Sequence, residues 1–387
     1  MNRSRFTDVE RLQCLVQASG LDAVLATSRE NVTYCGGLYD PGLRTMPNRL
    51  HVALWPAEGE PVFILPQYRL GEETLIADRR GYEFYVRADA PTDPRGVPHV
   101  HQAPIALLAE TLREKGLARG RLGLETHSLP AAHFLSLQQA LPEARFVDCT
   151  SLLEEARMIK TPAEIDCLAA AARATDAAIG RAFARARPGS AASELAATIA
   201  EGLLRQGADG LAFLELDVAR DGQRLDFAEA PTDLRPGDLV RVDGGGYFEG
   251  YLSDVARMAV VGQPTPAQQQ TYARTLEMQR RIIHQVLRPG VPGGQLYGAM
   301  ARLFEEAGFA APWGQIVHGL GLYIHERPWL REVETYTLQP GMVLCVEAIV
   351  HQPPWAMVHI EDLVLVTESG ARLLTDPASA ETLFVIE

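Results

Sequence analysis

The sequence has few cysteines, and their positions offer neither a ligand pattern nor a disulfide framework. The five residues are odd in number and far apart, and no two form a C-x-x-C pair: Cys14, Cys35, Cys149, Cys167 and Cys345. A cysteine zinc site is therefore disfavoured, and so is a disulfide-stabilised scaffold. This usage is typical of a reducing compartment, so we expect a cytoplasmic protein.

Long apolar runs and a surplus of basic residues are also missing. No run reaches the roughly 18 apolar residues that a membrane-spanning helix needs, and charged residues interrupt the first turns of the chain, so no signal-peptide core is expected. The 36 Lys and Arg are outnumbered by 49 Asp and Glu, which gives a formal charge of −13. This balance argues against nucleic acid or a membrane as a partner, because both attract a concentrated positive field.

What is present is the composition of a folded protein. Hydrophobic residues make up 47% of the 387 positions and charged residues 22%, which is ordinary for a globular chain and argues against disorder. At about 150 residues per domain, this length predicts two or three domains.

The first part of the chain predicts an α/β domain, because helical and strand-like patterns alternate along it. Helical spacing over 9–16 ends at Gly20, and a second helix is expected over 105–115. Short apolar runs ending in turn residues predict the strands, and a Pro-rich polar stretch over 88–104 predicts an exposed loop. The expected strands are 23–26, 51–55, 62–65 and 121–124.

A change of pattern near residue 155 predicts a second domain. Thr161-Pro162-Ala163-Glu164 has the residues of a helix start, with an N-cap threonine, proline next and glutamate third. Helices are expected over 162–187 and 191–206, followed by glycine-rich strands. We therefore expect domains over 1–154 and 155–387. Within the second, a helix pair followed by an acidic hairpin occurs twice, over about 162–262 and 265–369.

Two acidic hairpins stand out in this second half. Asp243 and Asp254 are centred between Phe248 and Glu249, so a tight turn there would place them opposite each other, with Cβ atoms roughly 5 Å apart. Two carboxylates at that separation repel each other unless a proton or cation lies between them. Taken alone, this hairpin favours the ordinary interpretation, in which Asp243 begins a turn and Asp254 is solvated.

The second hairpin repeats the arrangement with glutamates. Glu347 and Glu361 are centred on Pro354, and Glu361 lies in the apolar run 360–366. An acid in such a run is poorly placed unless it is paired or bound to a metal. His318 lies between the hairpins and precedes glycines, and oxygen ligands with one imidazole suit Mn, Co or Zn.

These residues resemble the ligand set of the pita-bread metallohydrolases, the family that includes prolidase, aminopeptidase P and creatinase. Three stretches carry the resemblance: D-x-G-x-x-x-x-G-Y-x-S-D at 243–254, H-G-x-G-x-x-x-H-E-x-P at 318–328, and Glu347 with Glu361-Asp362. The segments 20–34 and 159–165 also resemble the family's N-terminal domain and linker. Within the family, the chain as a whole resembles a bacterial Xaa-Pro dipeptidase most. The resemblance implies an α/β N-terminal domain followed by an α+β pita-bread catalytic domain with a pseudo-twofold repeat.

The resemblance also implies two divalent metal ions per chain, with Mn expected and Co or Zn as alternatives. Asp243 would hold one ion, His318 and Glu347 the other, and Asp254 and Glu361 would bridge them. A metal-bridged hydroxide would attack the substrate while Glu347 takes the proton. His325 would contact the substrate carbonyl or donate a proton.

Four positions depart from the family pattern. Asp226 stands 17 residues before Asp243, where histidine is usual, and His359 stands two residues before Glu361, where arginine is usual. Ala256 and Ala348 replace threonine and proline. We expect His359, with His325, to bind substrate, although an imidazole lacks the five-donor fork of arginine.

The function implied is that of a metallopeptidase that cleaves Xaa-Pro dipeptides or similar small peptides, as a homodimer. Two alternatives stay open at the level of sequence. One is a small-molecule C–N hydrolase of the creatinase or ectoine-hydrolase type, and the other is a non-catalytic pita-bread binding protein.

Overall fold

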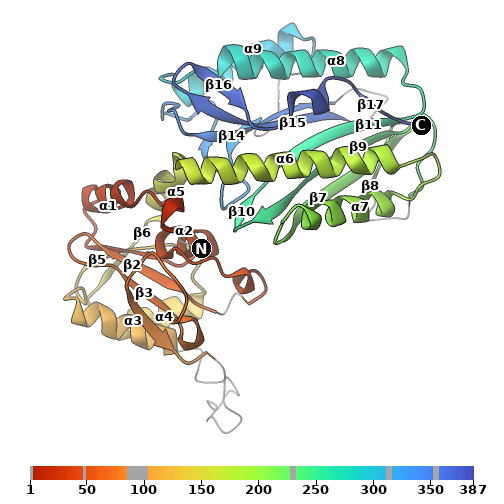
Figure 1. Cartoon of the computed structure of the whole chain (residues 1–387). Helices are drawn as coiled ribbons and strands as arrows, with labels where there is room; N and C mark the ends of the chain where they lie inside the picture. The colour runs from red at the N-terminus through yellow and green to blue at the C-terminus, as the bar shows by residue number, and fades with distance from the viewer. Residues whose placement is uncertain (1–2, 47–48, 85–102, 227–231, 311–315, 352–356) are drawn as a thin grey trace. The chain divides into compact units, whose positions relative to one another are not determined.

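The computed structural model describes residues 3–46, 49–84, 103–226, 232–310, 316–351 and 357–387 (Figure 1). The chain divides into two compact units, Met1–Arg157 and Met158–Glu387. We expected the boundary after residue 154, which lies inside helix α5 (Thr150–Met158) and three residues before the observed boundary. In the described residues, no helix is both long enough and apolar enough to cross a membrane.

The first unit is built on one mixed sheet. Its central strand β1 pairs with β5 in parallel and with β2 in antiparallel orientation. Strands β1, β2 and β3 are buried throughout, which explains why their sequences are continuous apolar runs. In spatial order the strands are β4 (Asp78–Tyr82), β3 (Val62–Pro66), β2 (Val52–Pro56), β1 (Ala23–Ala26), β5 (Arg121–Leu124) and β6 (Arg145–Asp148).

The helices of this unit follow the expected alternation. They are α1 (Val9–Ala18), α2 (Arg29–Gly36), α3 (Ala103–Glu114) and α4 (Ala131–Ala140). The α/β prediction for this half is confirmed. Most of the loop expected over 88–104 lies outside the described residues, and α3 already begins at Ala103.

The second unit contains two sheets that meet where β11 lies beside β15. The first sheet has the order β17 (Phe384–Ile386), β11 (Val255–Val261), β9 (Leu239–Phe248), β7 (Gly210–Arg220) and β8 (Gln223–Asp226), with β10 (Tyr251–Leu252) paired to β9. The second has the order β13 (Glu326–Trp329), β12 (Val317–Gly319), β14 (Val343–Val350), β15 (Val358–Thr367) and β16 (Gly370–Leu373).

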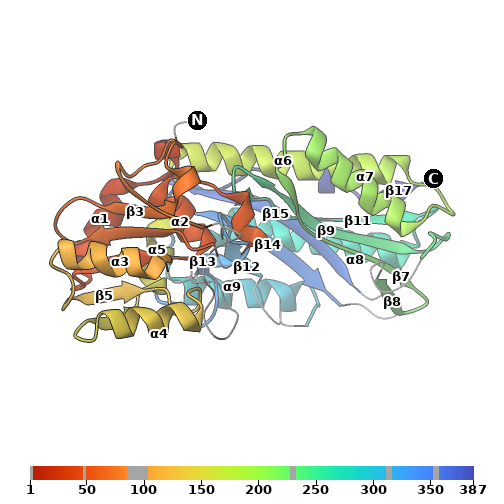
Figure 2. The same cartoon turned by 90° about the horizontal axis from the view of Figure 1, so that it is seen from below.

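Each sheet is covered by its own helices. Helices α6 (Pro162–Arg185) and α7 (Ala192–Arg205) pack on β9 and β7, as Figures 1 and 2 show. Helix α8 (Pro266–Arg281) packs on β14 and β15, and a π-helical turn (Ile282–Val286) leads on toward α9 (Gly293–Glu306). The repeated layout of helix pair and sheet predicted from the sequence is therefore present.

The two halves also begin alike. Thr161 caps α6 and pairs reciprocally with Glu164, and Thr265 caps α8 and pairs with Gln268 in the same way. In each case proline occupies the first helical position, where its missing N–H costs no hydrogen bond. The segments T-P-A-E and T-P-A-Q are thus a repeat in letters as well as in layout.

The pairing of the first hairpin differs from the prediction by two residues. Asp243 lies opposite Ala256, not opposite Asp254. The turn residues are Glu249 and Gly250, both with positive φ (52° and 89°), and the strands resume at Phe248 and Tyr251. The prediction was wrong because the two-residue turn lies one position later, and a non-glycine residue adopts the left-handed conformation there.

The second hairpin follows its prediction. Glu347 and Glu361 are direct partners in the antiparallel pair β14–β15. The turn predicted at Pro354 lies outside the described residues.

We expect Gly245→Ala to destabilise the second unit, because an added Cβ would lie 1.8 Å from the backbone oxygen of Ser253. Backbone cannot yield there without moving Asp254, and overpacking of this kind costs about 2 kcal/mol. Gly180→Ala is the matched control, since a Cβ on that helical residue meets nothing within 4 Å and should stabilise α6 by about 0.5 kcal/mol. Urea unfolding midpoints of both variants would check this, and an unshifted midpoint for Gly245→Ala would contradict it.

Candidate metal centre

The structure brings all seven predicted site residues together in the second unit. Three overlapping groups have ligand atoms within 4.8 Å of one another: Asp254, His318, Cys345 and Glu361; His318, His325 and Glu347; Asp243, His359 and Glu361. Because the groups share His318 and Glu361, they form one continuous cluster. Residues from β9, β12, β14 and β15 contribute, so the cluster depends on both sheets.

His318 lies in the middle of this cluster. Its Nε2 is 3.1 Å from Glu347 Oε1 and 3.9 Å from both Asp254 Oδ2 and Glu361 Oε1. Its Nδ1 lies 3.1 Å from the carbonyl oxygen of Gly319. A carbonyl can only accept, so Nδ1 carries the proton and the lone pair of Nε2 faces the carboxylates. This is the orientation of a histidine that ligates a metal.

Burial divides the acids into an inner and an outer pair. The side chains of Glu361 and Asp254 are 1% and 5% exposed, while those of Glu347 and Asp243 are 13% and 14% exposed. The outer pair therefore retains contact with solvent, which gives a substrate one side from which to approach.

The electrostatics of the cluster follow from this crowding. Burial, then the charges of Asp243 and Glu347, raises the pKa of Asp254 well above its ordinary value. Burial, then Asp254 and Glu347, does the same to the pKa of Glu361. Burial alone would raise the pKa of Glu347 too, but contacts with His318 and His359 reverse the effect and hold it below its ordinary value.

Several polar atoms of the cluster have no hydrogen-bond partner although they are buried. They are Asp243 Oδ1, His318 Nε2, His359 Nε2 and Glu361 Oε1. Buried polar groups in folded proteins are nearly always satisfied. Carboxylate oxygens and an imidazole lone pair pointing into one space therefore fit a divalent cation, and the residues present match such a group.

His325 stands at the edge of the cluster on the loop that follows β12. Its ring centroid is 4.5 Å from that of His318, in an edge-to-face arrangement. Burial and the neighbouring His318 lower the pKa of His325, which favours its neutral form. Its neighbour Glu326 is buried and forms an ion pair with Lys160, so the loop is anchored next to His325.

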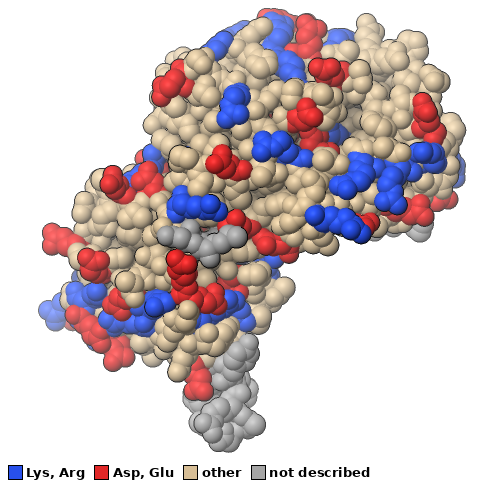
Figure 3. Space-filling model, viewed as in Figure 1, with Lys and Arg blue, Asp and Glu red and all other residues tan. Residues whose placement is uncertain are grey.

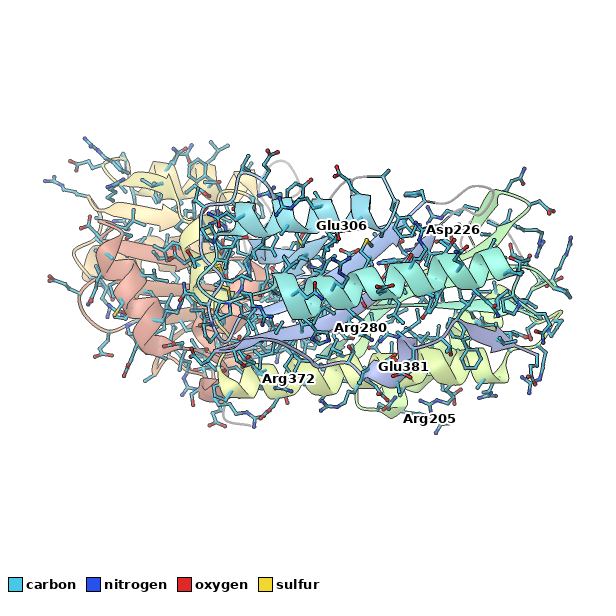
Figure 4. All side chains as sticks on the ribbon, turned by 90° about the horizontal axis from the view of Figure 1, so that it is seen from above. Arg205, Asp226, Arg280, Glu306, Arg372 and Glu381 are labelled. Carbon is cyan, nitrogen blue, oxygen red and sulfur yellow. The ribbon has the colours of Figure 1, made fainter. Side chains whose placement is uncertain are left out.

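Buried and partly buried arginines hold the strands that carry the acids, and the sequence did not predict them. Arg257 on β11 donates to the backbone oxygen of Glu361 (2.6 Å) and, with Arg280 of α8 (Figure 4), to the carboxylate of Asp362 (2.8 and 3.0 Å). Arg241 on β9 contacts Asp243 at 3.2 Å. The available signal was an arginine inside an otherwise apolar strand, as in L-V-R-V-D.

Two further neighbours were also missed. Cys345 lies two residues before Glu347, so it shares a face of β14 with it, and its thiol joins the group around His318. Gln279 of α8 donates from Nε2 to the carbonyl oxygens of Val346 (3.1 Å) and Ile360 (3.2 Å). It thereby joins β14 and β15 beside Glu347 and Glu361.

Asp226 is not part of the cluster. It ends β8, opposite Asp217, with a side chain 30% exposed (Figure 4). Phe227, which follows it, lies outside the described residues.

Comparisons with known proteins agree with this geometry. The model of metallopeptidase family M24 matches residues 166–368, and that of the creatinase/prolidase N-terminal domain matches 9–159. A probable dipeptidase PepE of Mycobacterium tuberculosis is 32% identical over 332 residues, which cover 84% of this chain and 82% of the relative. A Xaa-Pro dipeptidase of Pyrococcus furiosus is 32% identical over 220 residues, 56% of this chain and 63% of the relative.

Solved structures show the same architecture. The dipeptidase PepE from Mycobacterium ulcerans superposes with a TM-score of 0.78 at 29% identity and covers 97% of this chain and 96% of its own. A Xaa-Pro dipeptidase from Bacillus anthracis gives 0.80 at 25% identity, with 97% and 98% covered. The predicted family and fold class are confirmed, as are a peptidase activity and divalent-metal binding. The chain belongs to metallopeptidase family M24, with a creatinase/prolidase N-terminal domain ahead of the catalytic domain.

Proposed function

We propose that this peptidase hydrolyses Xaa-Pro dipeptides or similar small peptides with the help of two divalent metal ions. The observation that carries the proposal is the complete set of five ligand residues in one buried cluster, with ligand atoms left without hydrogen-bond partners. The printed names of the relatives, dipeptidase and Xaa-Pro dipeptidase, support the substrate class.

The ligand roles follow the positions of the side chains. Asp243 would hold one ion, His318 and Glu347 the other, and the inner acids Asp254 and Glu361 would lie between the ions. Bound there, the ions would activate a water and polarise the scissile carbonyl. We propose Mn²⁺ as the native ion, with Co²⁺ and Zn²⁺ as the alternatives that these oxygen and imidazole ligands also suit.

The chain's own residues supply proton handling and substrate contact. Glu347 is partly exposed, and contacts with His318 and His359 lower its pKa, so it is ionised at neutral pH and able to accept a hydrogen bond from a water. Its role as proton acceptor is proposed from the family resemblance. His325 is exposed and its lowered pKa favours the neutral ring, which suits a hydrogen bond from its ring N–H to the substrate carbonyl.

His359 is buried, whereas a residue that binds substrate must be reachable from solvent. It is 1% exposed and lies among Asp243, Glu347, Glu361 and Arg241. This burial favours a role toward the carboxylates over the substrate contact expected from sequence. Substrate contact would then rest on His325.

Three finer features belong to the same proposal. The wide spacing of the five cysteines in the sequence supports a cytoplasmic location, and the family resemblance suggests a homodimer. The face shown in Figure 3 carries both acidic and basic side chains, and the formal charge of −13 argues against nucleic acid as the partner. No observation favours a small-molecule C–N hydrolase or a non-catalytic binding protein.

We expect the affinity for Mn²⁺ to rise with pH from acidic toward neutral and higher values. The raised pKa values of Asp254 and Glu361 mean that the metal-free cluster holds protons, and the metal must displace them. Each displaced proton makes affinity change about tenfold per pH unit below the relevant pKa. Calorimetry in buffers of different ionisation enthalpy measures both the affinity and the protons released. Binding that is independent of pH and releases no protons would contradict this expectation.

Asp254→Asn should abolish both binding of the metal pair and turnover, because it removes a carboxylate placed between the two ions. Asp209→Asn is the control, since Asp209 is exposed and outside the cluster. Metal content and the hydrolysis of a Xaa-Pro dipeptide would be measured for both variants. Undiminished activity of the wild type after exhaustive chelation would refute the metal mechanism.

The substrate class is tested with the Mn²⁺-supplemented wild type. A panel of Xaa-Pro dipeptides, longer X-Pro peptides, creatine and ectoine should show cleavage of the dipeptides. Cleavage of creatine or ectoine alone would transfer the chain to the C–N hydrolases, and metal binding without any turnover would favour a binding protein.

A further inference from the structure

Arg241 connects the metal centre with a group of acids behind it. It lies two residues before Asp243 on β9, so both side chains point to the same face of the strand. Its guanidinium is 7% exposed and donates to Glu215 (2.6 Å), Asp217 (2.6 Å) and Asp243 (3.2 Å). One Nη1 serves two neighbours, because it also lies 3.3 Å from His359 Nδ1.

The contact between Arg241 and His359 determines where the imidazole carries its proton. A guanidinium has five donors and no acceptor, so its N–H must donate to His359 Nδ1. Nδ1 therefore accepts, and in the neutral ring the proton is on Nε2. That nitrogen lies 3.4 Å from Glu347 Oε2 and 3.8 Å from Glu361 Oε2. Its N–H thus faces oxygens of two ligand residues.

The two buried imidazoles of the centre consequently differ in tautomer. His318 donates from Nδ1 to its neighbouring carbonyl and turns a lone pair toward the carboxylates. His359 accepts at Nδ1 and turns an N–H toward them. The lone pair of His318 can bind a metal, whereas the N–H of His359 can only donate to a carboxylate. The two histidines of the cluster therefore have different roles.

We propose that Arg241 and His359 form a positioning pair for the metal centre: Arg241 orients Asp243 and fixes the tautomer of His359, whose Nε2–H faces Glu347 and which is not itself a metal ligand. The proposal rests on the proposed metal site. It accounts for an arginine within an apolar strand and for a histidine where the family usually has arginine, since the guanidinium is supplied from β9 instead. Outer-sphere partners of this kind typically contribute 10- to 100-fold to metal affinity.

The first test compares two arginines that share an acidic neighbour. Arg241→Leu should weaken Mn²⁺ binding about 10- to 100-fold, because Asp243 and His359 lose their donor. Arg224→Leu is the matched control, since Arg224 also pairs with Asp217 but its second ion pair is with Asp226. It should change affinity by less than about threefold, below the range expected of a partner to a ligand residue. Unchanged binding in Arg241→Leu, or an equal loss in both variants, would overturn the proposal.

The second test needs no substitution at Arg241, so it does not depend on the folding of that variant. Long-range ¹H–¹⁵N spectra of histidine-labelled, Zn²⁺-loaded wild type should show His359 protonated at Nε2 and His318 protonated at Nδ1. His359→Gln identifies the His359 signals by their disappearance. A His359 protonated at Nδ1, with Nε2 on the metal, would refute the positioning role. Wild type that binds neither Mn²⁺ nor Zn²⁺ would instead refute the proposed function.

Discussion

Mutual repulsion among four carboxylates is the constraint around which the second unit is organised. Asp243, Asp254, Glu347 and Glu361 lie in one cluster, and burial makes each uncompensated charge costly. Two divalent cations would balance the four charges, and without them protons must do so, as the raised pKa values of the inner pair indicate. The fold must therefore hold the acids together against their own repulsion, and sheet pairing with buried arginines does this.

The two halves of the second unit share the task of holding the four acids together. Each half of the second unit supplies a helix pair with a capping box at its start and a hairpin bearing two acids. Arg257 bonds the backbone at Glu361 while it pairs with Asp176 of α6, so it reaches from one half to the other. A centre assembled from two similar halves needs only modest distortion in each. The departure from symmetry lies in His318, which has no counterpart in the first half of the described cluster.

The sequence predicted which acids would lie together with His318, because they stand in recognisable motifs. Their role as metal ligands stays a prediction. The sequence also predicted the pairing of Glu347 with Glu361, since that register depends only on their spacing. The predicted pairing of Asp243 with Asp254 was wrong. The turn has a positive φ at Glu249, and a glutamate in the sequence does not predict that conformation. Arg241 and His359 are 118 positions apart. Their contact depends on how the sheets pack, which the spacing of residues in the sequence does not reveal. The sequence could identify His359 only as a departure from the family pattern, not as a neighbour of Arg241.

Through Gln279, the geometry of the metal centre depends on helix α8, although α8 contributes no ligand residue. Its side-chain amide spans two neighbouring carbonyls, one on β14 and one on β15, each adjacent in sequence to a glutamate of the cluster. The distance between those two glutamates therefore depends on the position of α8, because Gln279 holds both strands at these carbonyls. A displacement of that helix along its axis would alter the spacing of the ligands while leaving every ligand in place. In this chain, a substitution on α8 that moves Gln279 would therefore change the spacing of the ligands without altering any of them.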